Sequence, residues 1–212
     1  MSPVELIALA STVSLLAGWR LYLVTFVVGL AMRLGWIALP TELHALDVLA
    51  NSWIIGIAAV GTLAEFFADK IPWIDSAWDA VHSVVRPIGG ALLSMAIIDG
   101  GNPGWQVASL LLGGSAAFLA HAGKAGARTL INASPEPVSN IAVSTGEDVA
   151  TGGLLALAIA NPIASASIAL LLVLLSLWLV IAARRALRRL IAPKRSQTAV
   201  CRSNEHDHPT PD

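Results

Sequence analysis

The sequence predicts an all-α polytopic membrane protein with about six transmembrane helices, and three observations lead to this fold class. First, 56% of the 212 residues are hydrophobic and only 13% are charged, whereas a soluble domain usually carries roughly 25% charged residues. Second, several apolar stretches reach the ~20 residues that a helix needs to cross a bilayer core. Third, polar residues gather in two segments between those stretches, Ala68–Arg86 and Asn132–Asp148.

Six spans are expected in chain order. They cover about residues 4–34, 46–67, 87–98, 105–123, 149–160 and 163–183. The first is interrupted near its middle by Ala17–Arg20, where a glycine can break or closely pack a helix. Before the third, we expect a turn at Pro72 and a short amphipathic helix over Asp75–Val85. A helix of about a dozen residues rises only ~18 Å, so spans three and five are too short. The preceding polar segments are therefore expected to enter the membrane as re-entrant or broken helices.

The domain organisation is expected to be one helical membrane domain over residues 1–192, followed by a disordered polar tail over 193–212. An offset of about 63 residues aligns two units of the membrane domain, about 46–98 and 105–160. It places Pro72 on Pro135 and the pair Gly89–Gly90 on Gly152–Gly153. The sequence thus predicts an internal repeat of two polar hairpins, with the double glycines packed closely between helices.

The charge distribution predicts the orientation. After Ala183 the chain carries seven basic residues and three acidic ones. The positive-inside rule then puts the C-terminus in the cytoplasm, and an even number of spans puts the N-terminus there too. The expected location is the inner (cytoplasmic) membrane of a bacterium. Cys201 is the only cysteine, which excludes a disulfide framework.

The first polar segment is rich in carboxylates. Glu65 and Asp69 are four residues apart, as are Asp75 and Asp79, so each pair shares one helical face. Only Lys70 and Arg86 oppose these four carboxylates in the segment. Carboxylates in a membrane usually face a cavity and pair with one another. The alternative is an interfacial loop whose charges are solvated.

The second polar segment begins with a basic stripe. His121, Lys124 and Arg128 recur at spacings of three and four on one helical face. Further polar candidates follow them, namely Asn132, Ser134, Glu136 and Asn140. An ion-pair network between the stripe and the carboxylates of the other hairpin is the structural alternative to a functional site. Glu147 and Asp148 are expected to open a helix, where the macrodipole stabilises carboxylates.

Two further sites are expected near these segments. If the first helix is long and single, Arg20 lies too deep to reach an interface and should face the helical bundle; the alternative is that its side chain snorkels to the interface. Asp69 and Asn132 hold matching places in the two repeats, each three residues before an aligned proline. Both should lie where a helix ends, and their convergence would form an oxygen-lined cation site.

These motifs resemble a family of small bacterial membrane proteins known as domain of unknown function 4126. The resemblance covers nearly the whole chain from the first span to the sixth, and it implies an integral membrane location. Its motifs are A-G-W-R at 17–20, E-F-F-A-D-K-I-P-W-I-D-S-A-W-D at 65–79, R-P-I-G-G-A at 86–91, H-A-G-K-A-G-A-R at 121–128 and N-A-S-P-E-P-V-S-N at 132–140.

The residues favour passage of a small ion or polar solute through a polar site in the membrane. A membrane enzyme or binder acting on a lipid head group is the first alternative, and a non-catalytic scaffold subunit is the second. No P-loop, G-x-G-x-x-G, H-E-x-x-H or serine elbow occurs, so the sequence favours transport over an enzyme, and we expect no cofactor. The expected partners are the bilayer, the ion or solute, and a second copy packed through Gly113–Ala117, but no nucleic acid.

Overall fold

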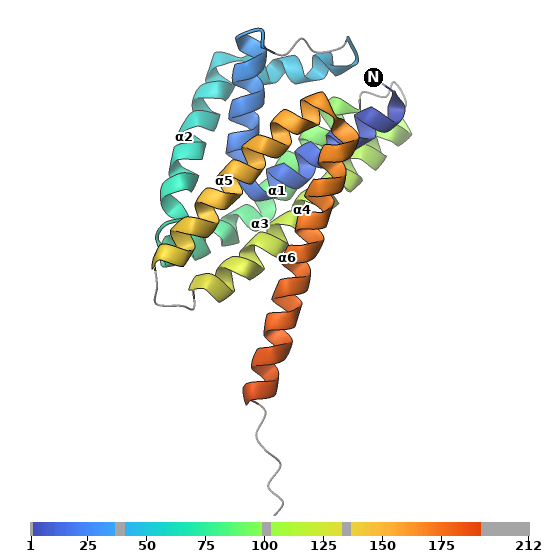
Figure 1. Ribbon diagram of the computed structural model, residues 1–212. Helices are drawn as coiled ribbons and strands as arrows, with labels where there is room; N and C mark the ends of the chain where they lie inside the picture. Colours follow the sequence, from blue (N-terminus) through green and yellow to red (C-terminus); the bar gives the residue numbers. More distant parts are fainter. Residues whose placement is uncertain (1, 37–40, 99–102, 133–136, 192–212) are drawn as a thin grey trace, which may run out of the picture. The chain divides into compact units, whose positions relative to one another are not determined.

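All regular structure in the described part of the chain is helical. The computed structural model describes residues 2–36, 41–98, 103–132 and 137–191. Figure 1 shows the order of the elements: α1 Pro3–Arg33, the 3-10 helix η1 Thr41–Ala50, α2 Ser52–Ala68, α3 Pro72–Ile97, α4 Pro103–Asn132, α5 Pro137–Ala160 and α6 Pro162–Ile191. Within these ranges, α1, α3, α4 and α6 are long and apolar enough to cross a membrane, and α2 is a shorter apolar helix. The chain is therefore an all-helical membrane protein.

The chain divides into two compact units, Met1–Val180 and Ile181–Asp212. All packing described below lies within the first unit. In the second, the described residues continue α6 as far as Ile191, and Arg184 and Arg185 are exposed. The predicted tail over 193–212 lies outside the described residues.

Helix α1 is central to the first unit, where it packs against α2, α3, α4 and α5. A capping box starts it: Ser2 Oγ accepts from the Glu5 amide, and the Glu5 carboxylate accepts from the Ser2 amide. All residues from Thr12 to Leu21 are buried. At Arg20 the backbone leaves the helical region, with φ −144° and ψ 67°. The predicted interruption of the first apolar stretch is thus confirmed.

Small residues bring α1, α3 and α4 into close contact. A Cβ atom on Gly18 would overlap Ala117 of α4, one on Gly90 would overlap the same alanine, and one on Gly113 would overlap Ser94. Ser14 Oγ donates to the Gly90 carbonyl oxygen at 3.0 Å, which links α1 to α3. Such residues allow backbones to approach in membrane bundles. Part of the Gly113–Ala117 run, expected at an oligomer interface, is therefore used inside the chain.

Two predicted boundaries are wrong. Helix α3 is one helix of 26 residues that passes through Pro87, not a short helix over Asp75–Val85 followed by a span from Pro87. Helix α5 likewise runs for 24 residues and includes residues 137–148 of the second polar segment. At about 1.5 Å per residue, both exceed the ~30 Å hydrocarbon core. Residues 72–86 and 137–148 of the polar segments thus form the first halves of two long helices. Proline costs a helix one hydrogen bond, which neighbours in a bundle can offset.

The helix ends follow the predicted repeat offset. A shift of 63 residues places Ile97, the end of α3, on Ala160, the end of α5, and Ala68 within one residue of the α4 end. The double glycines differ between the units. Gly89–Gly90 is tightly packed, whereas Cβ atoms on Gly152 and Gly153 would meet nothing within 4 Å in the described structure. The close packing expected at both pairs is found at the first only.

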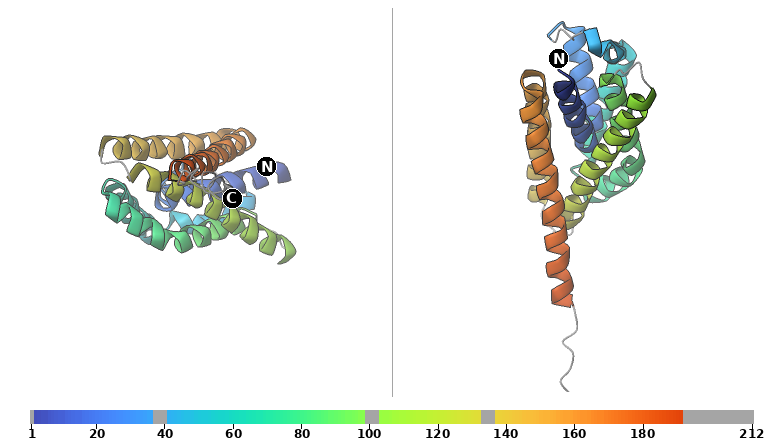
Figure 2. Two further views of the ribbon diagram at one scale, coloured as in Figure 1. Left: turned by 90° about the horizontal axis from the view of Figure 1, so that it is seen from below. Right: turned by 90° about the vertical axis from the view of Figure 1, so that its right-hand side faces the viewer.

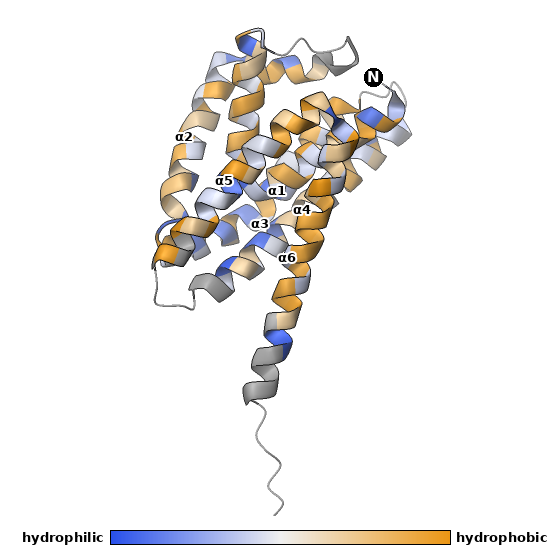
Figure 3. Ribbon diagram, in the orientation of Figure 1, coloured by the Kyte–Doolittle hydropathy of each residue, from blue (hydrophilic) through white to orange (hydrophobic). Residues whose placement is uncertain are grey.

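Hydrophobic and hydrophilic residues lie in different parts of the first unit. Helices α5 and α6 form a hairpin around Asn161 (Figure 2), where Ser165 Oγ donates to the Leu154 carbonyl oxygen at 2.7 Å. Figure 3 shows that α6 within the first unit and much of α2 are hydrophobic, while hydrophilic residues gather where α3, α4 and α5 come together. That polar region contains the candidate site.

Candidate functional site

Five helices contribute charged side chains to one buried group, called the ionic cluster below. Its members are Arg20 of α1, Glu65 and Asp69 at the end of α2, Asp75, Asp79 and Arg86 of α3, Lys124 and Arg128 of α4, and Glu147 and Asp148 of α5. The members from α1 to α4 are at most 6% exposed. Charged groups in such surroundings need counter-charges, because desolvating an ion costs several kcal/mol.

Asp69 lies where α2 ends, and three cations surround its carboxylate. Oδ2 contacts Arg20 Nη1, Lys124 Nζ at 3.5 Å and Arg128 Nη2 at 3.1 Å. Arg128 Nη1 also donates to the Asp69 carbonyl oxygen at 3.2 Å. Arg128 therefore satisfies both the carboxylate and a carbonyl that the helix end leaves without an intrahelical partner.

Glu65 lies one helical turn before Asp69 and is 1% exposed. Its Oε1 contacts Arg86 Nη2, Lys124 Nζ at 3.5 Å and Arg20 Nη1 at 3.9 Å. Its Oε2 is buried and has no hydrogen-bond partner among the described residues. One oxygen of this carboxylate thus carries all of its ion pairs, and the other is left over.

Helix α5 joins the cluster through Arg20. Arg20 Nη2 lies 3.4 Å from Glu147 Oε2, and Nε lies 3.0 Å from Asp148 Oδ1. The same Nη2 donates to the carbonyl and hydroxyl oxygens of Ser144, each at 3.1 Å. Glu147 Oε2 is also 3.2 Å from Arg128 Nη2. These contacts hold α1, α4 and α5 together around two carboxylates.

The break in α1 exposes backbone to the same cluster. Because Arg20 is not helical, the carbonyl groups just before it lose the regular pattern of acceptance along the helix. Lys124 Nζ donates to the Trp19 carbonyl oxygen at 3.2 Å. The ammonium group of Lys124 therefore satisfies a backbone carbonyl at the break in α1 and also pairs with the carboxylates.

Arg86 connects two carboxylates and a histidine. Nη2 donates to Glu65 Oε1, and Nη1 donates to Asp79 Oδ1 at 3.1 Å and to His121 Nδ1 at 2.7 Å. A guanidinium only donates, so His121 Nδ1 must present its lone pair. The ring is then neutral with its proton on Nε2, which lies 3.1 Å from both the Asp79 carbonyl oxygen and Ser83 Oγ.

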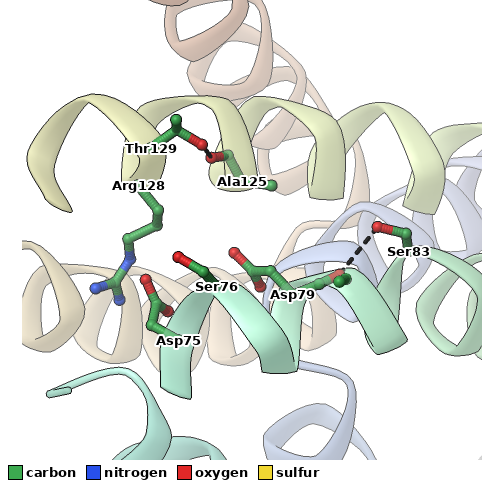
Figure 4. Close-up of a pocket in the computed structure, with 8 residues that line it drawn as sticks. Asp75, Ser76, Asp79, Ser83, Ala125, Arg128 and Thr129 are labelled. Carbon is green, nitrogen blue, oxygen red and sulfur yellow. Dashed lines mark hydrogen bonds between the residues drawn. The ribbon is translucent and has the colours of Figure 1, made fainter. Parts of the chain in front are cut away.

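Two cavities flank the ionic cluster. Cavity A, about 200 Å³, lies between α3 and α4 and is lined by Asp75, Ser76, Asp79, Ala80, Ser83, Ala125, Arg128 and Thr129. Figure 4 shows the Asp79 carboxylate directed across this gap toward α4. Cavity B, about 270 Å³, lies between α1, α2 and α5 and is lined by Arg20, Leu23, Thr62, Glu65, Phe66, Asp148 and Gly152.

The charges of the ionic cluster do not cancel. Six carboxylates, Glu65, Asp69, Asp75, Asp79, Glu147 and Asp148, stand against four cations, Arg20, Arg86, Lys124 and Arg128. His121 is neutral, so the fully buried members balance, four carboxylates against four cations. The surplus of two carboxylates is that of the half-buried Glu147 and Asp148.

A family model described as Domain of unknown function (DUF4126) matches residues 7–182, which include every member of the ionic cluster. The chain belongs to this family. The resemblance to this family is thereby confirmed. No curated protein and no solved structure matches the chain.

The structure brings most of the predicted site residues together. Those within or against the ionic cluster are Arg20, Glu65, Asp69, Asp75, Asp79, Arg86, His121, Lys124 and Arg128. Lys70 differs, because its Nζ donates to the Phe66 carbonyl oxygen at 3.2 Å and lies 3.3 Å from the centre of the Phe66 ring. Ser134 and Glu136 lie outside the described residues, and only the backbone of Asn132 and Asn140 is described. The Asp69–Asn132 cation site therefore stays a prediction.

Sequence reasoning assigned Glu147 and Asp148 to a helix start and so missed their place in the site. Helix α5 begins ten residues earlier, at Pro137, which puts both carboxylates well inside the helix, facing Arg20. Their i, i+3 and i, i+4 spacing from Ser144 was the available signal. Among the described residues, no group of three or more His, Cys, Asp or Glu side chains is placed to hold a metal ion.

Proposed function

We propose that this protein lets a small ion or polar solute cross the membrane, with the ionic cluster as its selective element. In this proposal all six α-helices are transmembrane, and α2–α3 and α4–α5 are two polar hairpins of an internal repeat. The membrane is the bacterial inner membrane, and both termini are cytoplasmic, as the basic residues after Ala183 indicate.

The observation that carries the proposal is the ionic cluster between two cavities, in which carboxylates outnumber cations by two once the half-buried Glu147 and Asp148 are counted. Buried negative charge without a fixed counter-charge attracts a proton or a cation. Glu65 and Asp148 line cavity B, and Asp79 lines cavity A. The cluster therefore offers its excess charge to cavities large enough for water, which occupies about 30 Å³ per molecule.

The break in α1 also supports transport. Discontinuous helices in transporters place backbone carbonyls and helix ends at the binding site. Here the break at Arg20 falls among the most buried residues of the bundle. The carboxylate, hydroxyl and carbonyl oxygens around it favour a proton or a hard cation over a soft metal.

A lipid head group fits the ionic cluster less well. A phosphate would need Arg86, Lys124 or Arg128, the cations expected for that role. Each of them already contacts a carboxylate within 3.5 Å. An incoming phosphate would have to displace these carboxylates and would add negative charge where it is already in excess.

Flux measurements in liposomes test the proposal. The purified protein is reconstituted, and the movement of H⁺, Na⁺, K⁺, NH₄⁺ and Cl⁻ is followed under an imposed membrane potential. We expect at least one cation to move at least tenfold faster than in protein-free liposomes. If no ion or small polar solute moves faster at either sign of the potential, the proposal is wrong.

Site-directed labelling tests the orientation. In a Cys201→Ser background, a cysteine replacing Asn102 should react with an impermeant thiol reagent added to the periplasmic side. Reaction only after the membrane is permeabilised would contradict a periplasmic position and, with it, cytoplasmic termini.

A further inference from the structure

Arg86 lies between two carboxylates that belong to different cavities. Its two terminal nitrogens are divided, since Nη2 contacts Glu65 Oε1 and Nη1 lies 3.1 Å from Asp79 Oδ1. Glu65 lines cavity B and Asp79 lines cavity A. The Arg86 side chain is 0% exposed. A single buried guanidinium therefore links a carboxylate of cavity A to a carboxylate of cavity B.

Each of the two carboxylates keeps one oxygen free. Glu65 Oε2 is buried without a hydrogen-bond partner in the described structure. Asp79 makes its side-chain contact through Oδ1, and no described residue partners its Oδ2. Asp79 is 6% exposed, and Figure 4 shows its carboxylate directed into cavity A. Each cavity thus meets a nine-tenths buried carboxylate with a free oxygen.

We propose that the ion is a proton, that Glu65 and Asp79 are the carboxyl groups that take it up, and that Arg86 is the gate between them. This inference rests on the proposed function and names its substrate. A metal cation moving from Asp79 to Glu65 would have to pass a guanidinium of its own charge, which holds one oxygen of each of these two carboxylates. A proton needs only a free carboxylate oxygen.

The proton steps balance without another reactant. A hydronium ion in cavity A gives its proton to Asp79 Oδ2, which leaves water and a neutral carboxylic acid. Arg86 Nη1 then loses its charged partner, while Nη2 keeps Glu65. The guanidinium moves toward Glu65, and water enters the gap. The proton leaves Asp79 for this water and reaches Glu65 Oε2, from which water in cavity B removes it as hydronium.

Arg86 cannot pass the proton itself, because a guanidinium remains charged and has no acceptor atom. His121 is also excluded as the carrier while Arg86 donates to its Nδ1. The neutral ring instead helps to hold Nη1 at its resting position. Displacement of the guanidinium is therefore the step that sets the resting flux.

The test is proton flux into liposomes, measured with an internal pH dye under a potassium diffusion potential. We expect Glu65→Gln and Asp79→Asn each to lower the flux at least tenfold, because an amide cannot take up the proton. Arg86→Lys keeps the charge but cannot contact both carboxylates through a rigid fork. We expect it to raise the flux at least threefold.

A second measurement uses the unaltered protein, in case a variant fails to fold. A hydrophobic carbodiimide adds to protonated carboxyl groups, and mass spectrometry should find the adduct on Glu65 or Asp79 as proton flux is lost. Unchanged flux in both amide variants, no rise in Arg86→Lys, or flux lost with adducts only elsewhere would overturn the inference. Na⁺ or K⁺ flux without proton flux would overturn it and leave the proposed function standing, whereas no flux of any ion would remove both.

Discussion

Helices α2 and α4 end at matching places but carry opposite charges near those ends. At the 63-residue offset, Glu65 of the first corresponds to Arg128 of the second. The first hairpin supplies Glu65 and Asp69, and the second supplies Lys124 and Arg128 against them. The α2 carboxylates could not be buried without these cations, since an unpaired ion in a bundle costs several kcal/mol. The two helices thus carry complementary charges at positions that the 63-residue offset aligns.

The double glycines show a second difference between the hairpins. Gly90 lies in the tight contact of α1, α3 and α4, where no Cβ fits. Its counterpart Gly153 meets open space, and the adjacent Gly152 lines cavity B. The first hairpin therefore builds the core, while the second leaves room beside the charges.

Removing a carboxylate from the first hairpin should cause the largest loss of stability. Asp69→Asn deprives Arg20, Lys124 and Arg128 of a shared counter-charge. We expect the free energy of unfolding to fall by about 3–5 kcal/mol, measured by denaturant titration in detergent micelles. The double variant Asp69→Asn with Arg128→Gln should lose less than the sum of the two single losses. Strict additivity would show that the two residues do not interact.

Replacing a double-glycine residue should lower the free energy of unfolding in the first hairpin but not in the second, and this loss is smaller than that of Asp69→Asn. Gly90→Leu should lower the unfolding free energy by about 1–3 kcal/mol, because the side chain overlaps Ala117. The matched variant Gly153→Leu should change it by no more than about 1 kcal/mol, and in the stabilising direction, since glycine weakens a helix by about that much. Equal losses in the two variants would contradict the difference in packing.

Hydropathy and charge predicted the membrane class and most of the ionic cluster, because apolar runs and polar residues at helical spacing are visible in one sequence. The continuity of α3 through Pro87 was not visible, since proline starts helices more often than it sits inside them. Packing around the helix decides between these cases. The same applies to Glu147 and Asp148, whose role depends on where α5 begins.

The asymmetry between the double glycines could not be predicted either. Both pairs are identical in sequence, and only the neighbours that the fold brings to them differ. Likewise, the helical face of His121, Lys124 and Arg128 was readable, but the position of Arg86 between Glu65 and Asp79 requires three helices to be placed at once.

The smallest effect is expected at Lys70, a cation of the first hairpin that lies outside the ionic cluster. Its contacts are with the carbonyl group and ring of Phe66, which are worth about 0.5–1 kcal/mol at an exposed site. Lys70→Met should therefore change ion flux less than twofold. A loss as large as that of the cluster variants would place Lys70 in the pathway.

The most direct test of a pathway beside the ionic cluster compares ion flux in Gly152→Leu and Gly153→Leu liposomes. Both substitutions have space around the new Cβ atom, so both proteins should fold and melt like the unaltered chain. Of these two glycines, Gly152 lines cavity B and Gly153 does not. We predict that Gly152→Leu lowers the flux at least tenfold by filling the cavity, and that Gly153→Leu retains it. Equal flux in the two folded variants would contradict a route through cavity B.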